Sequence, residues 1–269
     1  MKTILVLSSF SGKVGPAVYY AKLIAEKTNS ELLLVHTINS PVPPKSFSME
    51  YPEEGSSKTD DLTPQLIRKW AEGKEILSIE TNLVYTGEAR LNSLETILAT
   101  RDILMIVETH HAGDDLRSWF VNRREDGPYF PMLLVPEIDG FNDISKILFL
   151  MDPGDFDLDP LHFLVQLAYF FDAEITIADL CDRGPNRGEK RRRFNHFRFI
   201  SEQLNYFNIT FKELPSNDIP ETLKRYAESS KSNIISFTSG NKRLVSHMYD
   251  GHPKGSLVRE TGLPTLFFL

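Results

Sequence analysis

The chain contains the same series of apolar segments twice, and this repeat constrains the fold more than any other feature. Residues 4–9 (ILVLSS) return as residues 147–152 (ILFLMD), an offset of 147 − 4 = 143. Residues 30–36 return as residues 173–179 at the same offset, without a gap. Two matches in one register indicate a duplicated structural unit.

The later parts of the two copies also correspond, at shorter offsets. The matching segments are 102–106 with 233–237 (233 − 102 = 131) and 130–135 with 263–268 (263 − 130 = 133). The 269 residues are enough for two domains of ordinary size. The sequence therefore predicts two tandem domains, residues 1–138 and residues 143–269, joined by a short linker.

Composition limits the classes to which the protein can belong. The chain is 41% apolar and 25% charged, which is ordinary for a globular protein. It has no apolar stretch of the length that a membrane span needs, so we expect no membrane association. Residues 1–140 hold 14 Lys and Arg against 20 Asp and Glu, and the rest holds 16 against 17. Neither copy has the excess positive charge of a nucleic-acid-binding domain.

Cys181 is the only cysteine, so the chain cannot form an internal disulfide. A single cysteine fits a reducing compartment, and we expect a cytoplasmic protein.

Each copy alternates strand-like and helix-like segments. We expect strands at 3–8, 32–37, 79–85, 103–107 and 132–135, and again at 146–151, 174–180, 207–212, 233–237 and 264–269. We expect helices at 14–27, 63–75, 93–100, 160–171, 189–204, 218–229 and 253–260. Nearly continuous apolar strands separated by helices indicate a parallel sheet covered on both faces. The predicted fold class is α/β, with two doubly wound domains that each contain a parallel five-stranded sheet.

Five short features, in this order along the chain, carry a resemblance to a known family. The first is a second strand that has His near its end (32–37), and the second is the tetrapeptide 85–88 (YTGE), which a helix and the strand 102–106 follow. The third is the dipeptide Thr109-His110 directly after that strand region. The last two are a strand that ends in an acid (147–152) and the C-terminal segment 262–268 (GLPTLFF). Together they resemble the universal stress protein family in its tandem form, which has an adenine nucleotide alpha hydrolase-like fold. The resemblance implies that strands 132–135 and 265–269 pair across the domains, giving a pseudo-dimer within one chain. A further homodimer stays open.

The resemblance also implies a nucleotide site. Family members that bind ATP use an Asp after the first strand, an apolar residue after the second, and a phosphate loop G-x2-G-x9-G-(S/T) after the fourth. The glycines of such a loop let backbone N–H groups approach the phosphates. In the second copy the matching positions are Asp152, Leu180, Thr238, Gly240, Asn241, Gly251 and His252. Only Gly251 keeps its glycine, so the motif is partial, and ATP or AMP with Mg²⁺ is the expected ligand.

The first copy departs further from that pattern. Ser9 stands where the second copy has Asp152, and alignment on Thr109-His110 puts Glu108 and His111 at the first two glycine positions. A carboxylate there would repel phosphate. We therefore expect the first domain to be structural or to bind a protein partner.

The acidic turn Asp152, Asp155, Asp157 and Asp159 suggests a cation site. However, Pro160 and Gln166 stand where an EF-hand needs Gly and Glu. We interpret Asp159 as an N-cap followed by proline, and leave open that one of these acids holds Mg²⁺ beside a nucleotide. The histidines lack the spacing of a metal site.

The basic run 190–193 (KRRR) opens a predicted helix. We interpret it as a solvated helix face, the alternative being contact with an anionic partner.

The sequence contains no Walker loop, no dinucleotide fingerprint and no nucleophile elbow, and we assign no catalytic or metal-binding residue. The leading hypothesis is a non-catalytic sensor or scaffold that binds ATP or AMP in the second domain. The alternatives are a nucleotide-free module that binds an unidentified protein partner, and a weak ATP hydrolase.

Overall fold

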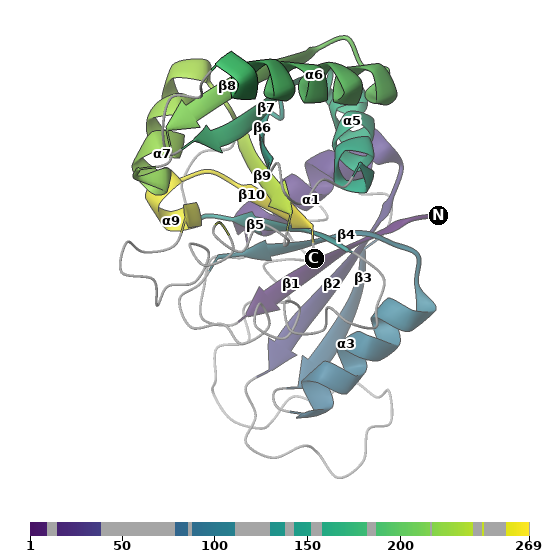
Figure 1. The fold of residues 1–269 in the computed structure, drawn as a ribbon. Helices are drawn as coiled ribbons and strands as arrows, with labels where there is room; N and C mark the ends of the chain where they lie inside the picture. Colours follow the sequence, from purple (N-terminus) through teal and green to yellow (C-terminus); the bar gives the residue numbers. More distant parts are fainter. Residues whose placement is uncertain are drawn as a thin grey trace, which may run out of the picture.

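In the computed structural model, the strands of both sequence repeats join in one ten-stranded sheet (Figure 1). The sheet order is β3-β2-β1-β4-β5-β10-β9-β6-β7-β8. The structure describes residues 1–9, 15–38, 79–85, 88–110, 130–137, 143–151, 158–181, 187–215, 217–238, 244 and 257–268. The strands are β1 (Thr3–Ser9), β2 (Glu31–Ile38), β3 (Ile79–Tyr85), β4 (Ile103–Thr109), β5 (Pro131–Val135), β6 (Lys146–Met151), β7 (Glu174–Cys181), β8 (Ile209–Pro215), β9 (Ile234–Thr238) and β10 (Thr265–Phe268).

Five parallel strands form each half of this sheet. Strands β1 to β5 pair in parallel in the first half, and β6 to β10 do so in the second. The halves meet at β5 and β10, which pair antiparallel with Leu133 opposite Leu266. The predicted fold class and the predicted pairing of the last strands are therefore confirmed. This junction pairs one edge strand of each half, so neither edge is left open.

Helices cover both faces of the sheet, as the apolar strand patterns predict. Helices α1, α5 and α6 pack on one core, which includes Val6, Ile24 and Leu164. Helices α3, α7 and α9 pack on the other, which includes Leu94, Leu223 and Leu257. The strands β4 and β5 are almost completely buried between these layers. The helices are α1 (Gly15–Thr28), α3 (Glu88–Thr100), α5 (Asp159–Phe171), α6 (Arg187–Leu204), α7 (Ile219–Ser230) and α9 (Leu257–Thr261).

The predicted element types are correct throughout the described residues, but several bounds shift. Strand β8 runs two to three residues later than the predicted 207–212, and α3 begins five residues before the predicted 93–100. The predicted helix 63–75 and residues 253–256 lie outside the described residues.

The prediction for the start of α5 was wrong. The N-cap is Leu158, which makes no side-chain cap bond, while Asp159 is the first helical residue and favours the helix dipole instead. In α7, by contrast, Asp218 accepts a hydrogen bond from the backbone N–H of Glu221.

The register of the sheet also corrects the sequence alignment of β4 with β9. Ile4 pairs with Met105, and Ile147, its counterpart in the second copy, pairs with Ile234. From Met105 onward the offset is therefore 234 − 105 = 129, rather than the 131 inferred from the sequence. A register irregularity between Thr3 and Ile4 accounts for part of the difference, because an extra residue in a strand shifts everything after it.

Candidate functional site

The candidate site lies at the carboxyl ends of β6, β7 and β9. Strand β6 is flanked by β7 on one side and by β9 on the other. From β6 the chain continues to β7 and β8 on one side of the sheet and later returns to β9 and β10 on the other side. The carboxyl end of β6 is therefore the topological switch point of a doubly wound sheet. Ligands of such sheets bind in the crevice outside the carboxyl ends of the strands at this point.

Two of the predicted nucleotide-site residues are described, and the sheet brings both to this edge. Leu180 lies near the end of β7 and Thr238 ends β9, and both are partly exposed. Leu180 packs against the core beneath α7 and α9. Thr238 follows Phe237 of that same core, so strand alternation directs Thr238 to the opposite face. The two residues therefore flank β6 from opposite faces of the sheet.

The other predicted positions of the site lie outside the described residues. They are Asp152, Gly240, Asn241, Gly251 and His252.

A buried polar cluster adjoins Leu180. The guanidinium of Arg193, on α6, donates from Nη1 to the carboxylate of Asp179 and contacts the Sγ of Cys181. Asp179 is 1% exposed, so the carboxylate of this ion pair has almost no contact with water. The Cys181 thiol also lies 3.6 Å from the backbone oxygen of Asp179. The cluster ties the first half of α6 to the end of β7.

Burial and the neighbouring charges determine how this cluster titrates. Burial, followed by the Asp179 carboxylate, raises the pKa of the Cys181 thiol, although Arg193 opposes the shift. Burial is the largest single influence on Arg193 and disfavours its charged form, but Asp179, Cys181 and Glu213 together outweigh burial, so the pKa of the guanidinium is raised. Arg193 therefore stays protonated, and the thiol stays neutral and poorly nucleophilic at neutral pH.

Arg193 also corrects the interpretation of the basic run. Arg191 and Arg192 are exposed, as a solvated helix face requires, but Arg193 turns inward to Asp179. The sequence did carry a signal for this. Arg193 precedes Phe197 by four residues and Ile200 by seven, and both belong to the inner face of α6.

The first half presents a different surface at the equivalent edge. With the corrected register, Thr109 is the counterpart of Thr238 and Glu108 that of Phe237. Thr109 is 2% exposed and is followed by buried His110, whose N–H donates to the Val135 oxygen at 2.7 Å. Glu108 therefore lies inside β4, and its predicted position at the first glycine of a phosphate loop was wrong.

Within the described residues, no group of three or more His, Cys, Asp or Glu side chains is placed to hold a metal ion. Asp155 and Asp157 of the acidic turn lie outside them. In the same part of the chain, no helix is long and apolar enough to cross a membrane.

Solved structures share this fold along nearly the whole chain. A proposed universal stress protein from Pseudomonas aeruginosa UCBPP-PA14 matches with a TM-score of 0.56 at 14% identity, covering 99% of this chain and 92% of its own. A universal stress protein from Archaeoglobus fulgidus DSM 4304 matches with a TM-score of 0.55 at 10% identity, covering 98% and 95%. The cytoplasmic domain of a prokaryotic cation chloride cotransporter gives 0.57 at 12% identity, covering 100% and 95%.

These similarities concern the fold, because the identities are low. No family model matches the sequence, and no curated protein matches it either. The chain has the fold of the universal stress proteins, and its activity has to be argued from its own residues.

Proposed function

We propose that the protein is a universal stress-type sensor or scaffold, without catalytic activity, that binds ATP or AMP with Mg²⁺ in its second half. One observation carries the proposal. The same threonine position is buried in the first half, as Thr109, and partly exposed in the second, as Thr238. A partly exposed side chain at a switch point is available to a ligand, whereas a buried one is not.

In this proposal each predicted position has a role. Leu180 packs against the adenine ring, and Asp152 contacts the nucleoside. The loop carrying Thr238, Gly240, Asn241, Gly251 and His252 surrounds the phosphates. Backbone N–H groups of such a loop supply the favourable electrostatics without requiring a lysine. The proposed domains remain residues 1–138 and 143–269, and the proposed location is the cytoplasm.

Arg193 offers a route from nucleotide occupancy to a change at the surface. It joins α6 to Asp179, the residue directly before Leu180. A nucleotide in contact with Leu180 would favour one arrangement of this end of β7. Because the ion pair joins β7 to α6, the nucleotide would also favour one position of α6. A ligand shifts such an equilibrium by its difference in affinity for the two arrangements.

Thermal unfolding with and without millimolar Mg-ATP tests the proposal, together with mass spectrometry of co-purified nucleotide. A ligand of the native state stabilises it by about 2.7 kcal/mol at a hundredfold excess over Kd. We expect a higher Tm for the wild type and no shift for Asp152→Ala. The matched control is Ser9→Ala, at the equivalent position of the first half, which should keep the shift. An equal shift in both variants, or none in the wild type, contradicts the proposal.

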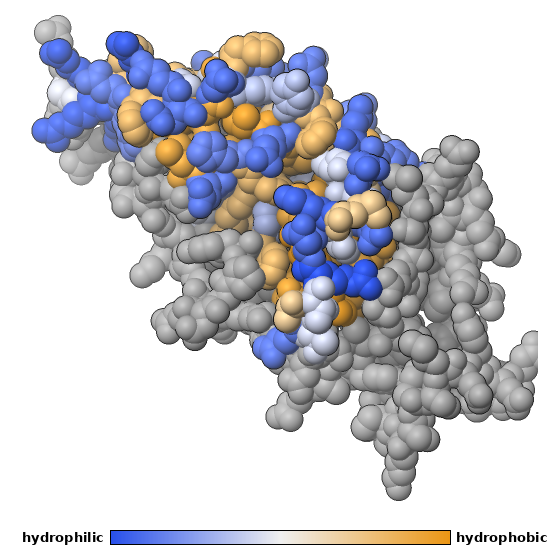
Figure 2. All heavy atoms as spheres, turned by 90° about the vertical axis from the view of Figure 1, so that its right-hand side faces the viewer, coloured by the Kyte–Doolittle hydropathy of each residue, from blue (hydrophilic) through white to orange (hydrophobic). Residues whose placement is uncertain are grey.

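A second candidate, the nucleotide-free interaction module, is favoured by exposed aromatic side chains on α5, on α6 and just after α6. They are Phe207 (91% exposed), Tyr169 (78%), Phe194 (62%), Phe199 (50%) and Phe170 (46%). Aromatic and arginine side chains are enriched at protein interfaces, and Arg191 and Arg192 are exposed on α6 as well. Figure 2 shows the side of the molecule on which α5 and one end of α6 lie. On this side apolar side chains are interleaved with polar ones.

The charge on α6 points to an acidic partner protein, because a symmetric contact between two copies would bring like charges together. A labelled peptide rich in aspartate and leucine serves as the probe. If this second candidate is correct, the peptide binds to the wild type and does not bind to the double variant Phe194→Ser/Phe199→Ser, whose Tm equals that of the wild type. Absence of binding to the wild type contradicts it.

The hydrolase alternative is tested with the same protein by phosphate release from ATP. Release that disappears in Asp152→Ala would favour it over the sensor.

A further inference from the structure

A groove whose lining includes polar and charged side chains lies at the opposite edge of the second half from the candidate nucleotide site. Its volume is about 430 Å³, within the range typical of small-molecule pockets. It is formed where β6, β9 and β10 begin, with α7 along one side. Lys224, Lys231, Asn233 and Glu228 contribute its amide and charged groups.

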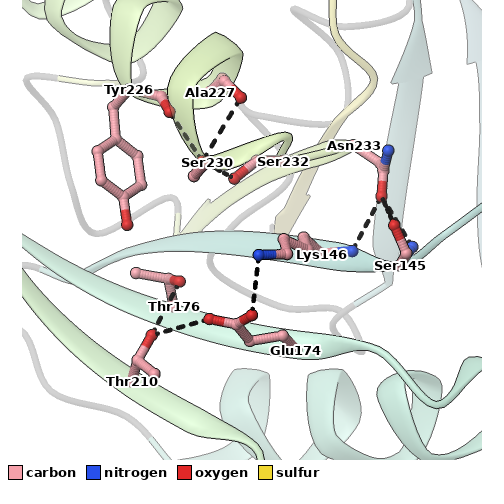
Figure 3. Close-up of polar contacts among 10 residues, drawn as sticks. All are labelled: Ser145, Lys146, Glu174, Thr176, Thr210, Tyr226, Ala227, Ser230, Ser232 and Asn233. Carbon is pink, nitrogen blue, oxygen red and sulfur yellow. Dashed lines mark hydrogen bonds and ion pairs between the residues drawn. The ribbon is translucent and has the colours of Figure 1, made fainter.

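Asn233 presents unused hydrogen-bond donors at this groove. Its Oδ1 accepts from the Ser145 N–H at 2.8 Å, the Ser145 hydroxyl at 2.6 Å and the Lys146 N–H at 2.9 Å (Figure 3). Three donors on one atom fix the orientation of the amide, because only the oxygen can accept them. The Nδ2 amino group of Asn233 therefore has two N–H donors, and neither meets an acceptor in the described part of the chain.

Two lysines add positive charge to the same groove. Neither Lys224 nor Lys231 forms an ion pair with a carboxylate among the described residues. Lys231 caps the carboxyl end of α7, where the helix dipole by itself favours a cation. Lys224 lies nearly two turns earlier, beyond the reach of that effect. The helix dipole therefore does not explain why both lysines lie at this groove.

The hydroxyl groups of the lining are already engaged. The Ser232 hydroxyl shares a hydrogen bond of 2.7 Å with Ser230 (Figure 3), and the Thr261 hydroxyl donates to the Leu257 oxygen at 2.8 Å. The unused groups of the described lining are therefore the Nδ2 amino group of Asn233 and the two ammonium groups, opposed by the single carboxylate of Glu228. A lining with surplus donors and a net positive charge favours a ligand that is anionic and rich in acceptors.

We propose that this groove binds a small organic phosphate. A phosphate group offers acceptors in several directions to two point charges and an amide, whereas a carboxylate is best matched by the planar fork of an arginine. The volume leaves room for an organic group beside the phosphate. This second site is independent of the proposed nucleotide site, because the two lie at opposite ends of the strands.

Isothermal titration with glucose 6-phosphate, glycerol 3-phosphate and 3-phosphoglycerate tests the proposal, with glucose as the uncharged control. We expect at least one phosphate ester to bind the wild type and glucose not to bind. The double variant Lys224→Ala/Lys231→Gly should weaken that binding at least about tenfold, the loss of roughly one charge-assisted hydrogen bond. Glycine suits position 231 because the backbone there has φ 59°, so the fold is retained.

Lys212→Ala is the matched control, since Lys212 is an exposed lysine of β8 outside the groove. It should bind as the wild type does, and so should Asp152→Ala, which separates this site from the nucleotide site. No binding of any of the three esters to the wild type overturns the proposal. Equal weakening in the double variant and in Lys212→Ala also overturns it, because general electrostatics would then explain the binding.

Discussion

The two halves of the sheet share strand order and direction, and apart from the irregularity between Thr3 and Ile4 they share register, yet they differ where the strands end. In the first half, Glu108, Thr109 and His110 are all buried at the end of β4. In the second half, Phe237 is buried at the position of Glu108, and Thr238 beyond it is partly exposed. Most of the inner strand positions that fill the core are apolar in both halves, so the fold depends on them. The terminal positions have diverged, which agrees with our proposal that only the second copy binds a nucleotide.

A second difference lies at the end of the neighbouring strand. The register pairs Ser8 with His36 in the first half and Met151 with Asp179 in the second, so His36 and Asp179 are equivalent. Asp179 holds Arg193 of α6, and this connection needs the carboxylate. The second half therefore has a charged link between a strand end and an outer helix at the edge where we propose the nucleotide.

The largest expected effect comes from Phe237→Ala. Phe237 is completely buried and stacks against Phe267 at a centroid distance of 6.4 Å. Loss of the ring should lower the free energy of unfolding by about 3–5 kcal/mol, measured by urea denaturation. The first half uses Glu108 at the same position, so Glu108→Gln, which conserves size, should cost less. A larger loss for Glu108→Gln than for Phe237→Ala would mean that the Glu108 carboxylate contributes more to stability than the Phe237 ring.

The next effect is that of Arg193→Met. The variant keeps most of the side-chain packing but leaves the Asp179 carboxylate buried without its cation. We expect a loss of about 3 kcal/mol in the free energy of unfolding. Arg192→Met, at the exposed neighbouring position, should change it by less than about 0.5 kcal/mol. Similar values for the two variants would contradict the buried ion pair and restore the simple solvated-face interpretation.

A smaller effect should follow from Asp218→Ala, which removes the side-chain cap of α7. The expected loss is about 1 kcal/mol in the free energy of unfolding. The start of α5 has no such cap, so Asp159→Asn, which keeps the side-chain shape, should cost less than Asp218→Ala. The reverse order in denaturation midpoints would place the cap at Asp159 after all.

The smallest effect concerns alkaline pH and Cys181. Because its pKa is raised in the folded protein, the native thiol keeps its proton above about pH 9, where the unfolded thiol loses it. The unfolded state then binds fewer protons, so stability falls as pH rises through this range. Cys181→Ser should remove this contribution, which we expect to be less than about 1 kcal/mol. Denaturation at about pH 8 and pH 10 measures it, and an identical pH dependence in both proteins would show that the thiol is not involved.

Most of the fold was predictable because it depends on periodicity. Apolar runs separated by helical patterns specify a parallel sheet, and the repeat specifies two copies. The alignment of β4 with β9 failed because a two-residue slip still matches most apolar residues with apolar residues, Met105 against Ser236 being the exception. The pairing of Ile4 with Met105 in the sheet resolves it, and the pairing of Ile106 with Met132 agrees.

The candidate site was less predictable. Leu180 and Thr238 were implied by the family resemblance, and the structure places both at the expected edge of the sheet, near the end of β7 and at the end of β9. The contact between Arg193 and Asp179 joins residues 14 apart on different elements. Helical spacing places Arg193 on the inner face, but the basic residues beside it suggested a solvated face. The unused donors of Asn233 depend on hydrogen bonds from Ser145 and Lys146, 87 to 88 residues away, and no sequence pattern indicates them.

The central claim is that only the second half binds nucleotide. Photolabelling with 8-azido-ATP, followed by mass mapping of the labelled peptides, tests it most directly. We expect label on peptides that contain Leu180 or Thr238, competed away by excess ATP, and none on the peptide that contains Thr109. Competed label on the Thr109 peptide, or equal label on both halves, would contradict it.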